Sequence, residues 1–214
     1  MLISHKHKFI TIDIPKTGTR TLRESLQPLG IIDVVGQPKW KNFYQHGSIN
    51  DCELGFKDRG WDFENYFKFS VVRNPWDRYF SFLTYYKMKA DEYSEEIEYP
   101  NELDKKQGEM AVDLFKGRSY AEVLKTLIQN RPPHSYFLLN EDNSCEFNRI
   151  TLFEDLNRGF EEFCLDVGVT APPLMHSNKS SASITKEEVY RQELIDMVAE
   201  KEKWVIDKFN YKYP

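Results

Sequence analysis

Residues 9–22 read FITIDIPKTGTRTL, and this stretch decides the fold class. From Phe9 to Ile14 apolar and polar side chains alternate and β-branched residues are frequent, which predicts a strand. The strand stops at Pro15, and Leu22 then begins an apolar helical face that ends at Gly30. The stretch therefore predicts a strand, a tight loop and a helix in direct succession.

The alternation of strands and helices continues along the chain. Further strands are predicted at residues 31–35, 67–72 and 149–153. Helices are predicted from Asn74, over residues 119–130, from Asp155, and as one long helix from Thr185 to about Phe209. Such an alternation predicts an α/β fold with a central, mostly parallel sheet flanked by helices, and ligands bind such sheets beyond the carboxyl ends of the strands.

The length of 214 residues predicts a single domain over residues 1–214. Within it, residues 91–109 are acidic and are interrupted by Pro100 and Gly108. We expect this segment to form an exposed insertion.

Charge and composition exclude several classes of function. The formal net charge of −5 and the pI near 5.6 argue against a nucleic-acid partner, because no general positive field is available to hold a phosphate backbone. No apolar run is long enough to span a bilayer, and the first residues do not resemble a secretory leader. The three cysteines are far apart and form no CxxC motif, so we expect no disulfide framework and no metal. The expected location is the cytoplasm of a cell.

The loop from Pro15 to Thr21 has the composition of an anion site. The first N–H groups of a helix have no partner inside the helix, and the helix dipole adds positive charge there. Gly18 allows close approach of an anion, while Lys16 and Arg20 add charge. The order of Lys16 and Gly18 differs from that of a Walker A loop, in which the Lys follows the second Gly. The alternative is a tight turn with a solvated Lys16.

A second segment, residues 71–82, reads VVRNPWDRYFSF. Arg73 stands at the end of a predicted strand, and Ser81 lies about two helical turns further on. The planar guanidinium of Arg73 suits phosphate oxygens, provided that the strand end folds back beside the helix. The alternative leaves Arg73 as a surface charge and pairs Arg78 with Asp77 or a nearby acid.

Together the two segments resemble the sulfotransferases. Residues 14–22 (IPKTGTRTL) look like the 5′-phosphosulfate loop of that family, and residues 72–78 (VRNPWDR) with Ser81 look like its 3′-phosphate motif. Weaker similarity continues through residues 151–156, 178–180 and 207–211. The branch that the motifs resemble most contains carbohydrate sulfotransferases and bacterial relatives, so the implied fold is a P-loop-like, three-layer α/β fold.

The resemblance implies a donor, 3′-phosphoadenosine 5′-phosphosulfate (PAPS), and no metal. Its sulfuryl group would pass to a hydroxyl or amine by in-line displacement, leaving 3′,5′-adenosine bisphosphate (PAP). Lys16 would stabilise the charge that develops on the bridging oxygen, and Arg73 and Ser81 would hold the 3′-phosphate. The 5′ end would be held by the remaining loop residues, which are Thr17, Gly18, Thr19, Arg20 and Thr21.

His46, between the two motifs, is where many family members carry a His, which implies a general base. A surface histidine is the alternative, and Glu53 and Asp33 are substitutes for the base. Two residues depart from the family pattern: Asp13 places a negative charge near an anionic donor, and Arg20 replaces a small residue. Which of the 31 aromatic side chains stacks on adenine is left open by the sequence.

Two further functions compete with an active sulfotransferase. One is a non-catalytic protein that binds the nucleotide or sulfate, and the other is a P-loop-type kinase for a small molecule. Against the kinase stand the order of Lys16 and Gly18 and the lack of an obvious magnesium-binding acid at a strand end. For the acceptor we expect a small molecule or carbohydrate with little charge, because the acidic residues 91–109 would disfavour a polyanion. The sequence leaves the oligomeric state open.

Overall fold

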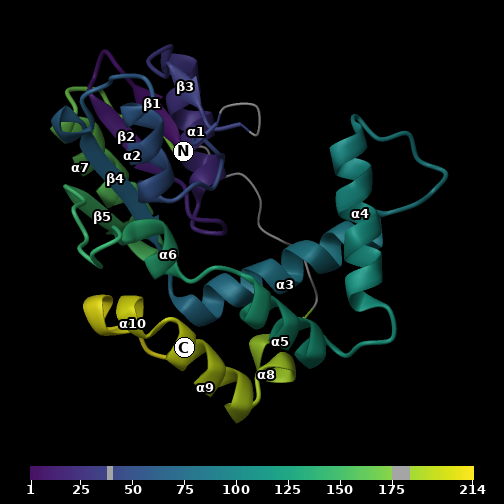
Figure 1. Ribbon diagram of the computed structural model, residues 1–214. Coiled ribbons are helices and arrows are strands. Elements are labelled where there is room, and N and C mark those ends of the chain that lie inside the picture. Colours follow the sequence, from purple (N-terminus) through teal and green to yellow (C-terminus); the bar gives the residue numbers. More distant parts are fainter. Residues whose placement is uncertain (38–40, 175–183) are drawn as a thin grey trace. The chain divides into compact units, whose positions relative to one another are not determined.

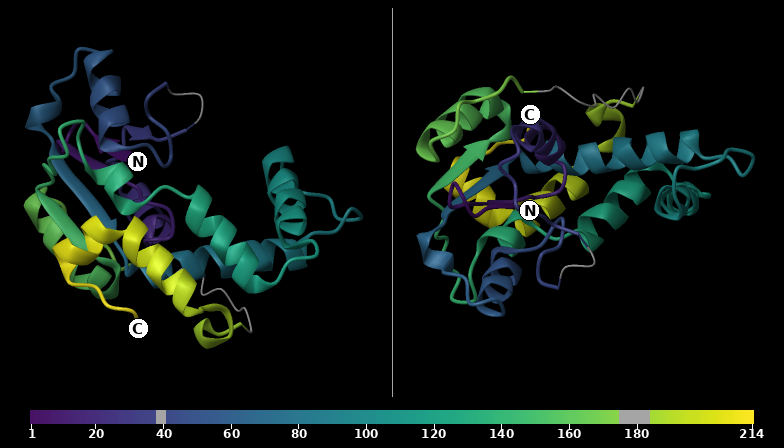
Figure 2. Two further views of the ribbon diagram at one scale, coloured as in Figure 1. Left: turned by 60° about the horizontal axis from the view of Figure 1, so that its bottom comes forward. Right: turned by 90° about the horizontal axis from the view of Figure 1, so that it is seen from above.

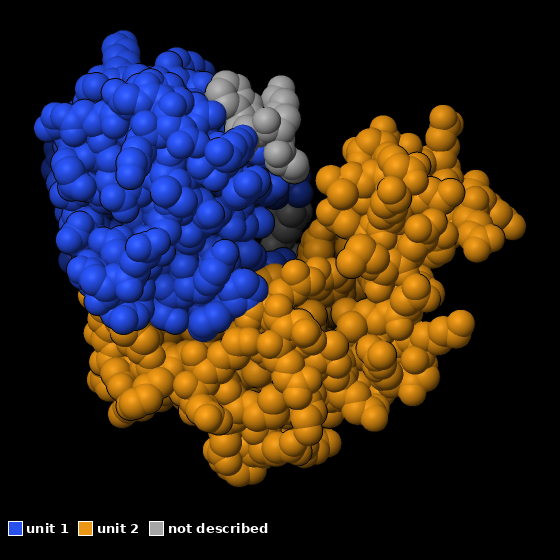
Figure 3. Space-filling view, in the orientation of Figure 1, with its two compact units in different colours: residues 1–74, 132–177 blue, residues 75–131, 178–214 orange. Residues whose placement is uncertain are grey.

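The computed structural model describes residues 1–37, 41–174 and 184–214 (Figure 1). The chain divides into two compact units, which Figure 3 distinguishes by colour. Residues 1–74 and 132–177 form the first unit, and residues 75–131 and 178–214 form the second. Whether the units together make the single predicted domain stays a prediction.

The first unit contains a five-stranded sheet in the order β3-β1-β2-β4-β5. The strands are β1 (Leu2–Ser4), β2 (Phe9–Ile12), β3 (Val34–Val35), β4 (Phe67–Val72) and β5 (Arg149–Leu152). Strand β2 pairs in parallel with β4, and β4 pairs in parallel with β5. Strand β1 runs antiparallel to both of its neighbours, so the other four strands share one direction. The predicted α/β fold with a mostly parallel sheet is confirmed.

Helices cover both faces of this sheet. Helices α1 (Thr19–Leu26) and α7 (Leu156–Asp166) share one core with the strands, and in that core Leu22 and Phe163 pack with Phe9 and Phe69. On the other face lies α2 (Ile49–Lys57), and in the right-hand view of Figure 2 α2 and α7 lie on opposite sides of the sheet. Each large apolar side chain buried in such a core contributes about 1.5–3 kcal/mol to stability. The sheet and the helices on its two faces form three layers, and their packing holds the carboxyl ends of β2 and β4 in place.

Three further short elements belong to the first unit, together with one short α-helix. The 3₁₀ turns are η1 (Gln27–Leu29), η2 (Phe63–Asn65) and η3 (Phe153–Asp155), and the helix is α6 (His134–Leu138). Gly30 ends the first helical segment with a left-handed φ of 65°, as its position in the sequence predicts.

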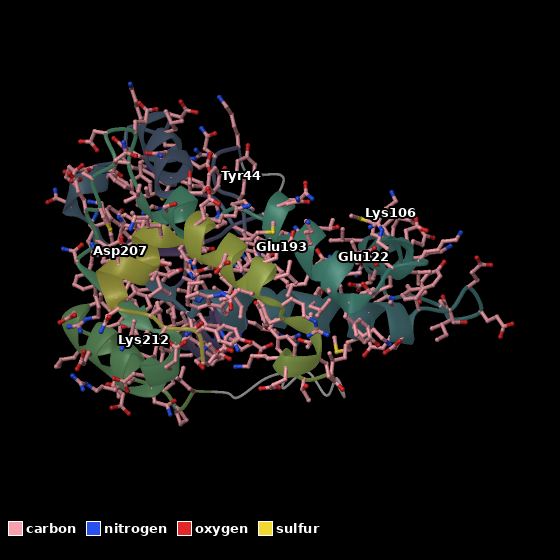
Figure 4. The ribbon with its side chains drawn as sticks, turned by 90° about the horizontal axis from the view of Figure 1, so that it is seen from below. Tyr44, Lys106, Glu122, Glu193, Asp207 and Lys212 are labelled. Atoms are coloured by element: carbon pink, nitrogen blue, oxygen red, sulfur yellow. The ribbon has the colours of Figure 1, made fainter. Side chains whose placement is uncertain are left out.

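The second unit is helical and has its own core. Its elements are α3 (Pro75–Glu92), α4 (Glu102–Phe115), α5 (Tyr120–Asn130), α8 (Lys186–Val189), α9 (Gln192–Lys201) and α10 (Lys203–Phe209). Side chains of α3, α5 and α9 form the core, among them Tyr79, Leu124 and Val198. The predicted capping pairs Ser119–Glu122 and Thr185–Glu188 are both present, and Figure 4 labels Glu122 on α5.

The prediction of one helix from Thr185 to Phe209 is wrong, since the chain forms α8, α9 and α10 there. The first break falls at Tyr190, whose backbone is extended and whose buried hydroxyl donates to the carbonyl oxygen of Trp76 at 2.7 Å. The second break falls at Glu202, whose buried carboxylate accepts from Arg78. Tertiary contacts at both residues outweigh the continuous helical pattern.

Strand β1, the helices α2, α4 and α6, and the 3₁₀ turns have no counterpart in the sequence prediction. Strand β1 is three residues long, too short for a pattern to emerge. Helix α2 lies in the stretch for which the sequence shows no sustained period, and α4 begins inside the predicted insertion. Helix α4 packs closely on the preceding segment at Gly108, where a Cβ atom would overlap the ring of Tyr93.

Candidate functional site

The loop between β2 and α1 has a backbone that few residues adopt readily. Lys16 has a φ of 69° and Gly18 a φ of 82°, both in the left-handed region. The buried hydroxyl of Thr17 donates to the carbonyl oxygen of Ile14 at 2.9 Å and so closes the turn. Gly18 is the N-cap of α1 and carries no side chain to occupy the first N–H groups of the helix, and the first turn has no acidic residue. The helix start is thus suited to an external anion.

Gly18 also lies close to the segment that follows β5. A Cβ atom at this position would come within 3.0 Å of both Leu156 Cδ2 and Phe153 Cε2. Glycine is therefore required here for two reasons, the positive φ and the lack of room. The loop is packed against η3 and the start of α7.

Arg73 joins the loop from the end of the neighbouring strand. Its Nη1 donates to the carbonyl oxygen of Lys16 at 3.2 Å, and its backbone N–H donates to His134 Nε2 at 3.4 Å. Its guanidinium carbon lies 4.4 Å from the centre of the Phe153 ring, a cation–π contact. The structure therefore brings together Lys16 and Arg73, which the sequence places 57 residues apart.

Lys16 and Arg73 form a pair of cations in a partly buried setting. Burial and, to a smaller extent, the charge of Arg73 together lower the pKa of Lys16 from 10.5 to about 8. Near pH 7 both side chains are still cationic. An anion placed between them would be held by two charges and would return the pKa of Lys16 towards its ordinary value.

His46 is tied to the end of β2. Its Nδ1 lies 2.7 Å from the carbonyl oxygen of Asp13, and since a carbonyl can only accept, Nδ1 carries the proton. In the neutral ring Nε2 is then unprotonated. The loop that carries His46 leads directly into α2, whose first turn is held by a capping box between Ser48 and Asp51.

The neutral form of His46 is the favoured one. Although the side chain is exposed at the surface, desolvation by the surrounding protein lowers its pKa below 6.5, and the positive charges of the Met1 ammonium and Arg23 act in the same direction. The hydrogen bond to Asp13 and the charge of its carboxylate oppose this shift. The net result is an imidazole with a protonated Nδ1 and a basic Nε2 near pH 7.

The carboxylate of Asp13 is compensated within the first unit. Its Oδ2 lies 2.6 Å from the Met1 ammonium and 3.4 Å from Arg23 Nη2, and only 1% of the side chain is exposed. Thr11 donates to the other oxygen, Oδ1, at 2.8 Å. The negative charge that the sequence places next to the loop is thus matched by two cations.

The remaining predicted residues are less closely connected to the pair formed by Lys16 and Arg73. Arg20 is exposed and pairs with Glu24 on α1. Thr19 and Thr21 form the first turn of α1. Of the substitutes for the base, Glu53 is exposed, and Asp33 accepts from the backbone of His5. The similarity at residues 178–180 lies outside the described residues.

Ser81 lies on α3 and belongs to the second unit, so its predicted place beside Arg73 stays a prediction. The alternative pairs Arg78 with Asp77 or a nearby acid, and the structure pairs it with an acid far along the chain. Arg78 is fully buried and donates to Glu202 at 2.9 Å, while Asp77 pairs with Lys186 at 2.5 Å.

Sequence reasoning missed the residues that surround Arg73. His134, Phe153 and Glu154 all contact Arg73 or its neighbour Asn74. Two signals for Phe153 and Glu154 exist in the sequence. They lie in the segment of weaker similarity at residues 151–156, and they follow directly on the strand at 149–152, where parallel strands end at a common edge. For His134 no comparable signal exists.

The comparisons with known proteins give weak likenesses. No family model and no curated protein matches the chain. A sulfotransferase from Alicyclobacillus acidocaldarius is similar with 17% identity and a TM-score of 0.35, over 98% of this chain and 82% of that one. The mouse sulfotransferase SULT7A1, solved in complex with PAP, is similar with 16% identity and a TM-score of 0.34, over 99% of this chain and 81% of that one. At these values neither likeness carries an argument about activity, so the case for function rests on the site.

The described residues show neither a metal-binding cluster nor a membrane-spanning helix. Over residues 1–37, 41–174 and 184–214, no group of three His, Cys, Asp or Glu side chains is arranged to hold a metal ion. In the same part of the chain, no helix combines the length and the apolar character needed to cross a bilayer.

Proposed function

We propose that the chain is a sulfotransferase that moves the sulfuryl group of PAPS to a hydroxyl or amine acceptor. The observation that carries the proposal is the hydrogen bond from Arg73 Nη1 to the carbonyl oxygen of Lys16. It joins the loop that resembles the 5′-phosphosulfate site to the strand end that resembles the 3′-phosphate site. Both lie at the carboxyl edge of adjacent parallel strands, where such folds bind nucleotides.

The residues present fit a nucleotide with two separate anionic groups. Lys16 and Arg73 supply two cations, and the uncapped start of α1 supplies N–H donors. Gly18 keeps the loop free of a side chain at its tightest point. The 5′ end would be held by residues 16–21, and the 3′-phosphate by Arg73 with Ser81.

The donor supplies the sulfuryl group, and the chain's own residues supply charge and a base. Lys16 stabilises the negative charge that appears on the leaving oxygen as its bond to sulfur breaks. His46 Nε2 takes the acceptor's proton as the new bond to sulfur forms, and the carbonyl of Asp13 holds the imidazole in the required tautomer. The proposed reaction needs no metal, because the charge on the leaving group is met by Lys16 and Arg73.

The orientation of His46 supports an enzyme over a non-catalytic binder. A general base needs an imidazole with one nitrogen held and the other basic, and the carbonyl of Asp13 holds Nδ1 of His46 in this way; a binder does not need it. The acceptor we propose is a small molecule or carbohydrate with little charge, consistent with the acidic residues 91–109.

Calorimetric titration with PAP tests the donor site directly, with 5′-AMP and ATP as controls. We expect micromolar binding of PAP and binding of AMP and ATP weaker by about a hundredfold, as the loss of a charge-assisted phosphate contact implies. Arg73→Ala should remove this preference. Equal affinity for PAP and AMP in the unmodified protein would refute the proposed donor, and preferred binding of ATP would favour the kinase.

A further inference from the structure

The register of the sheet places two residues after β5 beside two residues after β4. The last bridge between these parallel strands pairs Val72 with Leu152. One residue further on, the guanidinium of Arg73 lies over the ring of Phe153 at 4.4 Å. One residue beyond that, the N–H of Asn74 donates to Glu154 Oε1 at 2.8 Å. The parallel pairing of the strands thus continues as side-chain contacts beyond the sheet.

The ring of Phe153 also lies against the loop. Its Cε2 and Cδ2 atoms are the ones that a Cβ at Gly18 would approach, at 3.0 and 3.1 Å. One side chain therefore contacts both parts of the candidate site, the loop at Gly18 and the cation at Arg73. Phe153 is partly buried.

The Phe153 ring contacts Arg73 at the guanidinium carbon, which lies over the ring at 4.4 Å from its centre. Arginine binds phosphate through N–H groups that lie in the guanidinium plane, whereas a ring contact at the carbon does not take up those groups. The contact removes rotational freedom from a long side chain without using the donors that an anion needs. The carbonyl of Lys16 fixes one of those donors, Nη1, and so sets the rotation of the group in its plane.

We propose that Phe153 is a positioning residue that orients Arg73 for a phosphate on the 3′ position of the nucleotide. This inference rests on the proposed function, because it concerns how Arg73 is held to recognise the 3′-phosphate of the donor. It predicts that the ring of Phe153 controls selectivity for the 3′-phosphate, while the nucleotide's other contacts do not depend on it.

Phe153→Leu tests this proposal, because leucine keeps apolar bulk against Gly18 but has no aromatic face. We expect PAP to bind about tenfold more weakly, in line with the loss of a partly desolvated cation–π contact, and AMP to bind within about twofold of its original affinity. Phe153→Tyr keeps the ring and should restore the preference for PAP. Phe160→Leu, in the core between the sheet and α7, is the matched control for loss of a phenyl ring and should leave the preference unchanged.

A double-mutant cycle separates positioning from general destabilisation. In an Arg73→Ala background, Phe153→Leu should change the affinity for PAP by less than about twofold, because the ring acts through Arg73. Additive losses would overturn the proposal. A parallel loss of PAP and AMP binding in the single variant would overturn it too, since the ring would then support the whole site.

A measurement without nucleotide keeps the two proposals apart. At this distance the ring current of Phe153 shifts the NMR signal of the Arg73 Nε–H, so this signal should move in Phe153→Leu and stay in Phe153→Tyr. An unmoved signal in Phe153→Leu would overturn the positioning role, whatever the nucleotide measurements give. If the unmodified protein fails to prefer PAP, the proposed function fails, and the signal alone decides whether Phe153 orients Arg73.

Discussion

Arg73 donates from Nη1 to the carbonyl oxygen of Lys16 across 3.2 Å, although 57 residues separate the two in the chain. The contact forms because β2 and β4 are adjacent and parallel, so the segments that follow them emerge at one edge of the sheet. It fixes the backbone of the loop at the residue whose φ is 69°. The contact also places two cations, Lys16 and Arg73, close together in a partly buried setting, and the effect on the stability of the fold can be measured.

Lys16→Met should stabilise the fold near pH 7 by about 1–3 kcal/mol, since one pKa unit corresponds to about 1.4 kcal/mol. In the folded protein the pKa of Lys16 lies at about 8, below the ordinary value of 10.5. Below pH 8 the lysine is charged in both states, and burial of that charge lowers the free energy of unfolding. Between pH 8 and 10.5 only the folded protein loses the proton, so the penalty fades as the pH rises.

Urea unfolding at pH 7 and above pH 10.5 measures this effect. The gain of Lys16→Met should be largest at the lower pH and vanish at the higher one. Lys6→Met, at an exposed lysine, is the control and should change the free energy of unfolding by less than about 0.5 kcal/mol. A gain that is constant with pH would show that the charge of Lys16 is not its cause.

His46→Ala should reduce turnover by about 10²–10⁴-fold and leave the affinity for PAP within about twofold of its original value. The reason is that His46 acts on the acceptor's proton, whereas PAP is held by the loop and Arg73. Because desolvation lowers the pKa of His46, the acid limb of kcat/KM in the unmodified enzyme should lie below pH 6.5. Steady-state kinetics over pH 5–8, with titration of PAP on the same samples, give both quantities.

The control for His46 is a histidine outside the site. His7→Ala removes an imidazole whose Nδ1 contacts the carbonyl oxygen of Val167, and it should leave turnover unchanged. A loss of turnover of less than tenfold in His46→Ala would show that another group acts as the base. The absence of any turnover in the unmodified protein, with PAP bound, would favour the non-catalytic binder.

Gly18→Ala should destabilise the first unit more than Gly30→Ala does. Both glycines have a positive φ, which alone costs an alanine about 1 kcal/mol. Only at Gly18 would the new methyl group also meet neighbours, Leu156 and Phe153, at 3.0 Å, whereas nothing lies within 4 Å of the Cβ position at Gly30. We expect an additional loss of about 1–3 kcal/mol from the overpacking at Gly18.

Chemical denaturation of the two glycine variants measures this difference. The difference between them isolates the packing of the loop against the segment after β5. Equal losses would mean that the backbone conformation alone decides the cost. In that case Phe153 would not be held tightly against the loop.

Glu202→Gln should destabilise the second unit by about 3–5 kcal/mol, because it removes the charge opposite a fully buried arginine. Neither Arg78 nor Glu202 has any side-chain exposure. Asp207→Asn is the matched control on the next helix, where Asp207 pairs with Lys203 in solvent (Figure 4). It should cost less than about 0.5 kcal/mol.

Thermal or chemical unfolding monitored by circular dichroism compares the two variants. If the buried pair is replaced as a whole, by Arg78→Met with Glu202→Leu, much of the lost stability should return. A loss in Glu202→Gln as small as that in Asp207→Asn would contradict the burial of the pair.

The sequence by itself determined the strand–loop–helix unit and most of the elements that follow it. Phe9, Ile10 and Ile12 are strand formers in a short apolar segment, the strand ends at Ile12 shortly before Pro15, and Gly18 is the N-cap of the helix. Ser119 with Glu122 marks the start of α5 in the same way. These are local effects of backbone and side chain, which a pattern of neighbouring residues can express.

Only the tertiary structure decided what surrounds each charged residue. The pairing of β4 with β5 set Phe153 over Arg73, and the turn of the chain before α2 set His46 on the carbonyl of Asp13. The split of the last predicted helix likewise follows from Glu202, which is buried opposite Arg78. Contacts between residues tens of positions apart depend on strand order and helix packing, and no local pattern encodes them.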